Sequence, residues 1–110
     1  MQTIVELPEF IKRADKLLNP SQKDELITYL ATYIRAGELM IGTGGVRKLR
    51  WSARGKGKSG GVRIIYYYHS EIMPLFLLAV FSKSEKVNLS KSERNELAKL
   101  TKLLKDSYGV

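Results

Sequence analysis

The stretch VRIIYYYHSEIMPLFLLAVFS, residues 62–82, contains the two strands that we expect at the centre of the fold. Successive side chains of a strand point to opposite faces of a sheet. One face of residues 62–69 would carry Val62, Ile64, Tyr66 and Tyr68, and the other Arg63, Ile65, Tyr67 and His69. Residues 70–74 predict a turn, and the apolar run 75–82 is typical of an inner strand. The stretch therefore predicts an antiparallel pair.

The residues before this pair predict two more strands, with a helical hairpin between them in the sequence. Residues 46–53 predict the strand next to residues 62–69, and residues 2–7 predict a strand that Pro8 ends. Between them, helical spacing predicts a helix that stops at Asn19-Pro20. A second helix would begin at a cap formed by Ser21 with Asp24 and would end at Gly37.

The C-terminal part predicts a third helix. Ser90 and Glu93 form a capping box, and four leucines follow on one helical face: Leu97, Leu100, Leu103 and Leu104. The element order predicts a single α+β domain over residues 1–110, in which an N-terminal strand and a helical hairpin pack on an antiparallel sheet, followed by a C-terminal helix. We expect the helices on one face and the other face available for a ligand.

The positive charge is concentrated in the middle of the chain. The net charge is +8, and between Leu39 and Ser70 there are seven basic residues and no acidic residue. The remaining twelve basic and eleven acidic residues sum to +1. A concentrated positive field is what binding of a polyanion requires, so nucleic acid is the expected partner, ahead of an anionic membrane surface or an acidic protein.

Composition excludes several other classes of site. The chain has no cysteine and a single histidine, His69, so a disulfide framework and a thiolate or histidine metal site are not expected. The N-terminus does not resemble a secretory signal, and the longest apolar run, Leu75–Phe81, is too short to cross a bilayer. We therefore expect a cytoplasmic protein that does not enter a membrane.

A glycine-rich basic loop separates two of the predicted strands. Residues 54–61 read RGKGKSGG and contain Arg54, Lys56 and Lys58. The glycine that a nucleotide-binding P-loop requires is replaced by Ser52, and a strand follows instead of a helix. The loop is better interpreted as a flexible arm whose cations contact a phosphodiester backbone.

Aromatic and basic residues flank this loop. Tyr67 shares the face of Arg63 and could stack on an unpaired base, whereas Tyr66, Tyr68 and Trp51 are more typical of packing residues. Lys83 directly follows the apolar strand. If residues 62–69 pair with residues 75–82, Arg63 and Lys83 meet at the end where the loop enters.

Three ordered blocks of the sequence resemble a known family. Residues 42–48 (GTGGVRK), 54–67 (RGKGKSGGVRIIYY) and 81–85 (FSKSE), with Leu89-Ser90 after them, closely resemble HigB-type toxins of type II toxin–antitoxin modules in the RelE superfamily. The motifs cover about residues 40–93, and the element order covers the whole chain.

The resemblance implies a function and a set of site residues. It implies an mRNA interferase that acts in the ribosomal A site without metal or other cofactor, and a cognate antitoxin, commonly of the helix-turn-helix type. It assigns catalytic roles to Lys56, Lys58, Arg63 and Lys83. We expect the RNA to contact Arg47, Lys48, Arg50, Arg54 and Tyr67. Several relatives have a tyrosine shortly after the last basic residue, but residues 85–89 contain none.

The chemistry of these side chains fits RNA cleavage. Attack of a ribose 2′-hydroxyl on the adjacent phosphate gathers negative charge, which fixed cations stabilise. Arg63 would hold the phosphate, and the lysines would move protons, although the sequence does not say which lysine is base and which is acid. Two alternatives stay open: a gyrase-inhibiting toxin of the same superfamily, and a non-catalytic module that binds RNA or the ribosome.

Overall fold

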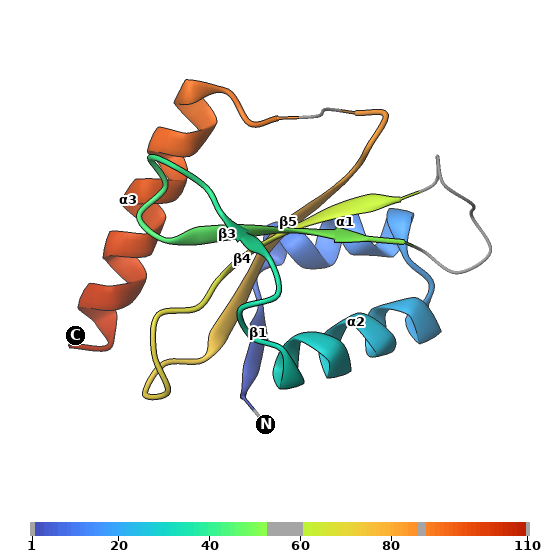
Figure 1. Cartoon of the computed structure of the whole chain (residues 1–110), viewed down its shortest axis with the longest axis horizontal. Helices are drawn as coiled ribbons and strands as arrows, with labels where there is room; N and C mark the ends of the chain where they lie inside the picture. Colours follow the sequence, from blue (N-terminus) through green and yellow to red (C-terminus); the bar gives the residue numbers. More distant parts are fainter. Residues whose placement is uncertain (1, 53–60, 86–87, 110) are drawn as a thin grey trace.

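The computed structural model describes residues 2–52, 61–85 and 88–109, and Figure 1 shows the arrangement of its helices and strands. The elements in chain order are β1 (Ile4–Glu6), α1 (Pro8–Leu17), α2 (Pro20–Thr32), β2 (Glu38–Leu39), β3 (Val46–Trp51), β4 (Val62–Tyr67), β5 (Leu75–Ser82) and α3 (Lys91–Ser107). The predicted order of strand, two helices, three strands and helix is confirmed, with the short strand β2 in addition.

The five strands form one mixed sheet in the order β1-β5-β4-β3-β2. β3, β4 and β5 pair antiparallel, as the short connections predict, while β1 pairs parallel with β5. The apolar strand β5 therefore has a neighbour on each side, which explains why nearly all of its side chains are buried.

The helix starts follow local capping chemistry. The Ser90 hydroxyl accepts a hydrogen bond from the Glu93 backbone N–H, and the Glu93 carboxylate accepts one from the Ser90 backbone N–H, so the predicted capping box of α3 is confirmed. The prediction that Ser21 caps the second helix is wrong. Asn19 forms the capping box with Gln22, because Pro20 suits the first helical position and needs no hydrogen-bond donor there.

The segment after α2 is shaped by Tyr66. The helix ends at Thr32 and not at the predicted Gly37. The buried Tyr66 hydroxyl donates to the Ile34 carbonyl at 3.0 Å and accepts from the Gly37 N–H at 2.8 Å. A Cβ on Gly37 would lie 2.8 Å from the Tyr66 ring, so only glycine lets the chain pass this closely.

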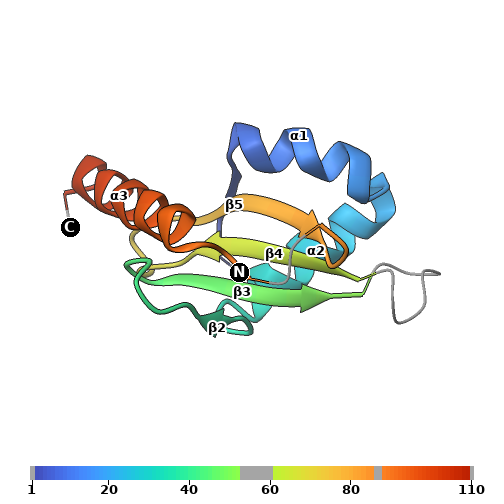
Figure 2. The same cartoon turned by 90° about the horizontal axis from the view of Figure 1, so that it is seen from above.

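The helices cover both faces of the sheet, and the expectation that they share one face is wrong. α1 and α2 pack on a core that includes Leu49, Ile64 and Tyr66, while leucines of α3 pack on a core that includes Ile65 and Phe76 on the opposite face. Figure 2 shows α3 across one end of this second face, away from the end where β3 and β5 finish. None of the described helices covers that other end.

The loop before β3 holds α3 against the sheet. Gly44 has φ +78°, and a Cβ there would lie 2.4 Å from the Thr101 hydroxyl oxygen. The buried Thr101 hydroxyl donates to the Thr43 carbonyl at 3.3 Å. This close approach fixes α3 at its end of the face and leaves the other end open.

Candidate active site

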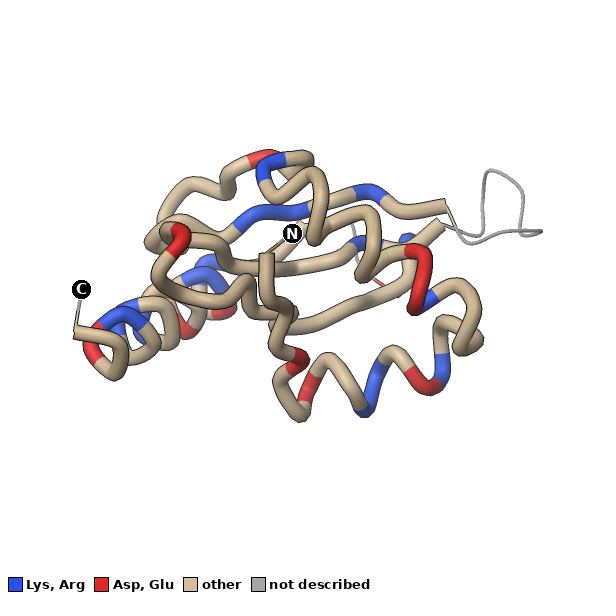
Figure 3. Tube along the Cα trace, turned by 90° about the horizontal axis from the view of Figure 1, so that it is seen from below, with Lys and Arg blue, Asp and Glu red and all other residues tan. Residues whose placement is uncertain are grey.

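Three basic side chains share the open end of the α3-side face. On β3, Lys48 and Arg50 alternate with Leu49, which belongs to the opposite core. In the register between β3 and β4, Arg50 is opposite Arg63 and Lys48 is opposite Ile65. Because Ile65 belongs to the α3-side core, the three cations lie on that face. Figure 3 shows that β3 carries basic and no acidic positions, whereas the long helices carry both.

Arg63 is the most enclosed of these cations, with 8% of its surface exposed. The residue opposite Arg63 on β3 is Arg50, and the residue opposite it on β5 is Phe81. Neither of these neighbours carries a negative charge. No hydrogen bond or ion pair joins Arg63 to another residue in the described ranges, and the residues outside those ranges include no Asp or Glu. A buried cation opposite a second cation costs free energy. The arrangement is suited to receiving an anion from another molecule.

Lys83 lies at the same end of the sheet. Its backbone N–H donates to the Gly61 carbonyl at 3.2 Å, which extends the ladder in which Val62 is opposite Ser82. The predicted pairing of the two strands is therefore confirmed. Lys83 is exposed, two residues beyond the partner of Arg63, and beside the point where the chain enters β4.

A turn at residues 82–85 holds Lys83, and Arg13 of α1 braces this turn. The Glu85 carboxylate accepts the Ser82 backbone N–H at 2.9 Å, and the Glu85 N–H donates to the Ser82 carbonyl at 3.1 Å. Arg13 forms an ion pair with Glu85 and donates its Nε–H to the Val80 carbonyl at 2.5 Å. The pKa of Glu85 is lowered, mainly by the hydrogen bond from the Ser82 backbone N–H and to a smaller extent by the Arg13 guanidinium. The carboxylate therefore stays charged.

An apolar groove of about 490 Å³ lies beside the basic face. It is lined by Ile65, Ala79 and Phe81 from the sheet and by Leu89, Leu97 and Leu100 from the segment that leads into α3 and from α3 itself. Its polar lining includes three carboxylates, Glu9, Glu93 and Glu96, together with Arg13. Because carboxylates repel phosphate groups, we expect an RNA backbone at Arg63 rather than in this groove.

Arg47 does not lie with the other predicted RNA-binding residues. Strand alternation places it on the opposite face, across the ladder from Tyr66. Its Nη1 donates to the Gly37 carbonyl at 2.7 Å and to the Arg35 carbonyl at 3.3 Å. Arg47 therefore holds the segment between α2 and β2, and it lies on the face opposite Arg63, apart from Lys48 and Arg50.

Tyr67 shares the face of Arg63 as predicted, but the α3-side core covers its ring. It is 1% exposed and belongs to the cluster with Val46 and Phe76. Burial raises the pKa of its phenol, and the hydroxyl has no hydrogen-bond partner among the described residues. A base cannot stack on a ring in this position, so the expectation that Tyr67 contacts RNA is corrected. Tyr66 and Tyr68 lie in the opposite core, as predicted.

Three of the predicted site residues, Arg54, Lys56 and Lys58, lie outside the described residues. Within the ranges that are described, no group of three His, Asp or Glu side chains is placed to hold a metal ion. None of the helices in those ranges is long and apolar enough to cross a membrane.

A family model described as the RelE toxin of the RelE/RelB toxin–antitoxin system matches residues 18–108. The chain belongs to the RelE toxin family. The match runs from the end of α1 to the end of α3 and includes the whole basic face. It confirms the superfamily that the motifs resemble and the α+β RelE-like fold. This RelE chain is therefore a toxin of a toxin–antitoxin system, from a family whose members are generally ribonucleases.

Proposed function

We propose that this RelE-family toxin is a ribosome-dependent mRNA endonuclease whose phosphate-binding group is Arg63. The observation that carries the proposal is the enclosure of Arg63 at 8% exposure, opposite Arg50 and with no anionic partner in the described structure. A fold keeps an unneutralised cation in such a position when a ligand supplies the missing charge. A phosphodiester in the ribosomal A site is the ligand that the family supports.

The proposed reaction is metal-independent transesterification. The ribose 2′-oxygen forms a bond to the adjacent phosphorus, and the bond from phosphorus to the 5′-oxygen breaks, leaving a 2′,3′-cyclic phosphate and a 5′-hydroxyl. Arg63 stabilises the charge that develops on the non-bridging oxygens. Lys56, Lys58 and Lys83 exchange the two protons, with one amine accepting the 2′-hydroxyl proton and another protonating the 5′-oxygen.

Lys48, Arg50 and Arg54 are proposed to hold the RNA backbone on either side of the cleaved bond. Lys48 and Arg50 lie on the same face as Arg63, at successive outward positions of β3. Electrostatic contacts of this kind position a strand without reading its sequence. We propose that the ribosome supplies the alignment of the reacting atoms, because holding reactants in place can contribute much of a rate acceleration.

The remaining assignments follow the HigB-type motifs. We propose a HigB-like subtype, a single toxin domain over residues 1–110, a cytoplasmic location and a cognate antitoxin of the helix-turn-helix type. Residues 42–48 and 54–67 support the subtype because they contain the blocks that resemble it.

The test is primer extension on a defined transcript in a reconstituted translation reaction. We expect translation-dependent cuts with the native protein, and none with Arg63→Ala or Lys83→Ala. Arg47→Ala is the matched control, because this arginine lies on an adjacent strand and faces the opposite side. Thermal unfolding of each variant shows that it is folded.

Two other outcomes would replace the proposal. Intact message together with inhibition of DNA supercoiling would indicate a gyrase inhibitor. Intact message with ribosome binding that weakens in the Arg63→Ala variant would indicate a binding module without catalysis.

A further inference from the structure

Arg94, in the first turn of α3, lies on the side of the helix that faces the loop leading into β3. Its Nη1 donates to the Ile41 carbonyl in that loop at 3.5 Å. Two turns further along the same side of α3, Thr101 packs against Gly44 of the same loop. Leu97, on the adjoining side of α3, lines the apolar groove instead. Arg94 therefore borders the α3-side face next to β3.

The cations of β3 connect the end of the sheet at Arg63 with the first turn of α3. Arg50 is opposite Arg63, and Lys48 is the next residue of β3 on the same face, about 7 Å further along the strand. Lys48 is opposite Ile65, which forms part of the groove wall together with the N-terminal half of α3. Glu38 lies opposite Lys48 on β2, but it is exposed and forms no ion pair within the described residues.

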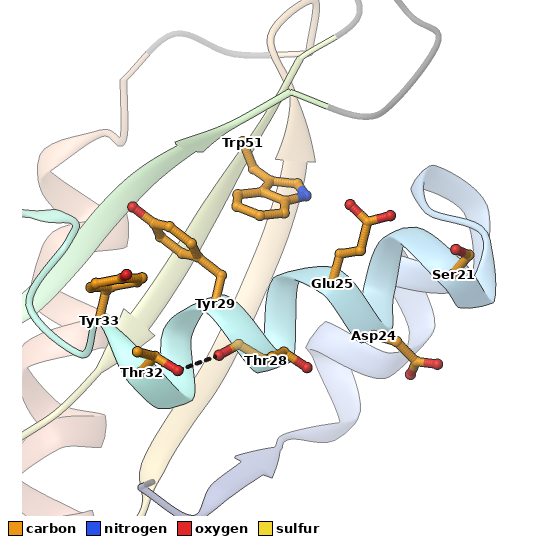
Figure 4. Close-up of a pocket in the computed structure, with 8 residues that line it drawn as sticks. All are labelled: Ser21, Asp24, Glu25, Thr28, Tyr29, Thr32, Tyr33 and Trp51. Atoms are coloured by element: carbon orange, nitrogen blue, oxygen red, sulfur yellow. Dashed lines mark hydrogen bonds between the residues drawn. The ribbon is translucent and has the colours of Figure 1, made fainter.

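The packing of Trp51 determines the side to which these cations point. Its ring lies beside Tyr29 of α2, with the two ring centroids 5.3 Å apart, as the close-up in Figure 4 shows. Because side chains alternate along a strand, residues 48 and 50 face the α3 side. The basic face and the first turn of α3 are thus on the same side of the sheet.

The charge of Arg94 is not neutralised within its helix. The positions three and four residues away, 90, 91, 97 and 98, are Ser, Lys, Leu and Ala. On the exposed side of α3, by contrast, Lys99 pairs with Glu96 and Lys102 pairs with Asp106. No ion pair joins Arg94 to another described residue, and the residues outside the described ranges include no Asp or Glu. Arg94 is therefore a cation that can receive an anion.

Arg94 contributes little to holding the loop that it contacts. The Thr43 hydroxyl donates to the Met40 carbonyl at 2.7 Å and accepts from the Val46 N–H at 3.0 Å, so this loop has its own lock. The bond from Arg94 is longer than an ordinary N–H···O bond. The half-buried Arg94 also has an enclosed Nε–H without a partner among the described residues, which costs free energy. A ligand that accepts from this N–H would remove the cost.

We propose that Arg94 is a further RNA-binding residue, which contacts a phosphate of the same strand away from the bond that is cleaved at Arg63. This assignment rests on the proposed function. A rotation of the side chain turns its Nε–H and Nη2 toward the basic face, where they donate side by side to two phosphate oxygens. Such a contact positions the strand and does not read its bases. Arg94 thus acts in binding and takes no part in proton transfer.

The test measures how binding of the full chain to RNA depends on salt. The probe is a fluorescently labelled uridine oligonucleotide of 2′-O-methyl nucleotides, which lacks the attacking hydroxyl and is not cleaved. We expect Arg94→Gln to weaken binding about 5-fold and to reduce the slope of log Kd against log salt by about 0.7, the value for one phosphate contact on a single strand. Arg94→Lys keeps the charge and should keep the slope.

Lys102→Gln is the matched control, because it removes the same charge from an exposed, ion-paired lysine of α3. It should bind the oligonucleotide with the native slope, and thermal unfolding shows that each variant is folded. Equal changes in Arg94→Gln and Lys102→Gln would overturn the proposal, as would a native slope in Arg94→Gln. A slope in Arg94→Lys as low as in Arg94→Gln would also overturn it, because charge would then not be the property that matters.

A second measurement separates this proposal from the proposed function. In single-turnover cleavage on programmed ribosomes, Arg94→Gln should raise the half-saturating concentration about 5-fold and keep the rate at saturation within about 2-fold. A large loss of rate at saturation would contradict a role in binding alone. If the native protein leaves the message intact, the proposed function fails, while the salt slope still decides whether Arg94 contacts RNA.

Discussion

Replacement of Arg63 by methionine should make the toxin more stable and inactive at the same time. Methionine keeps an unbranched stem of similar reach and removes the charge. Arg63 is enclosed, lies opposite Arg50 and has no ion pair in the described structure. Charged pairs directly opposite each other on neighbouring strands contribute up to about 1 kcal/mol, and like charges there are destabilising. Because Arg50 is exposed and screened, we expect a gain of at most about 1 kcal/mol.

A gain of this size has a clear thermal signature. For a domain of this length, about 1 kcal/mol raises Tm by about 4 °C. The cleavage rate should fall by about 10²- to 10³-fold, the usual cost of removing one preorganised group that stabilises a developing anion. Differential scanning calorimetry and single-turnover primer extension on stalled ribosomes measure the two effects on the same preparation.

The matched variant is Arg47→Met, for which we expect the opposite pattern. Its guanidinium donates to two backbone carbonyls, so its loss should lower Tm while the cleavage rate of the folded protein is kept. A lower Tm for Arg63→Met would refute the reasoning, because it would show that Arg63 stabilises the fold through contacts of its own.

Arg13→Ala should slow cleavage between about 10- and 100-fold by loosening the turn that holds Lys83, while Lys23→Ala, which removes the similarly exposed ion pair with Glu6, should leave the rate unchanged. The effect of Arg13→Ala should shrink in acid. The pKa of Glu85 is lowered, so its ion pair with Arg13 is present at neutral pH and is lost as the pH falls through that pKa. A pH–rate profile of the native protein and of Arg13→Ala would show this. Tyr66→Phe should cost about 1–3 kcal/mol in urea unfolding, since it leaves a buried N–H and a carbonyl without their partner, and an unchanged midpoint would contradict this role. Gly44→Ala should also lower the midpoint and expose α3 amides to hydrogen exchange, because its φ is positive and its Cβ would collide with the facing hydroxyl of α3; native-like protection of α3 would argue against that contact.

Much of the fold was predictable because local patterns and tertiary contacts agree. The alternation in residues 62–69 predicted the two faces of β4, and the apolar run 75–82 predicted an inner strand. The helical face of α3 was also predictable, but not the side of the sheet on which it packs. That side depends on the contact between Gly44 and Thr101, which lie far apart in sequence.

The site was predictable where strand parity and pairing determine it, and not where long-range contacts do. Arg63 and Lys83 come to one end because their strands pair in the expected register. Tyr67 has the right parity, but burial depends on where α3 crosses the sheet. The brace formed by Arg13 and Glu85 joins residues 72 positions apart, and no local pattern in either segment indicates it.

The register shift between β4 and β5 divides β5 into two halves with different phases. Ile65 is opposite Ala79 while Tyr66 is opposite Leu77, so Leu78 is an additional residue in β5. Before it, even-numbered residues such as Phe76 face α3, and after it, odd-numbered residues such as Phe81 do. If β5 instead alternated uniformly over its full length, with no additional residue, Phe81 would face the helical hairpin and would lose its place beside the basic face. The additional residue thus lets a single strand place Phe76 under α3 and Phe81 opposite Arg63 on the same side of the sheet, so a local irregularity in β5 sets the phase of the strand end that borders the basic face.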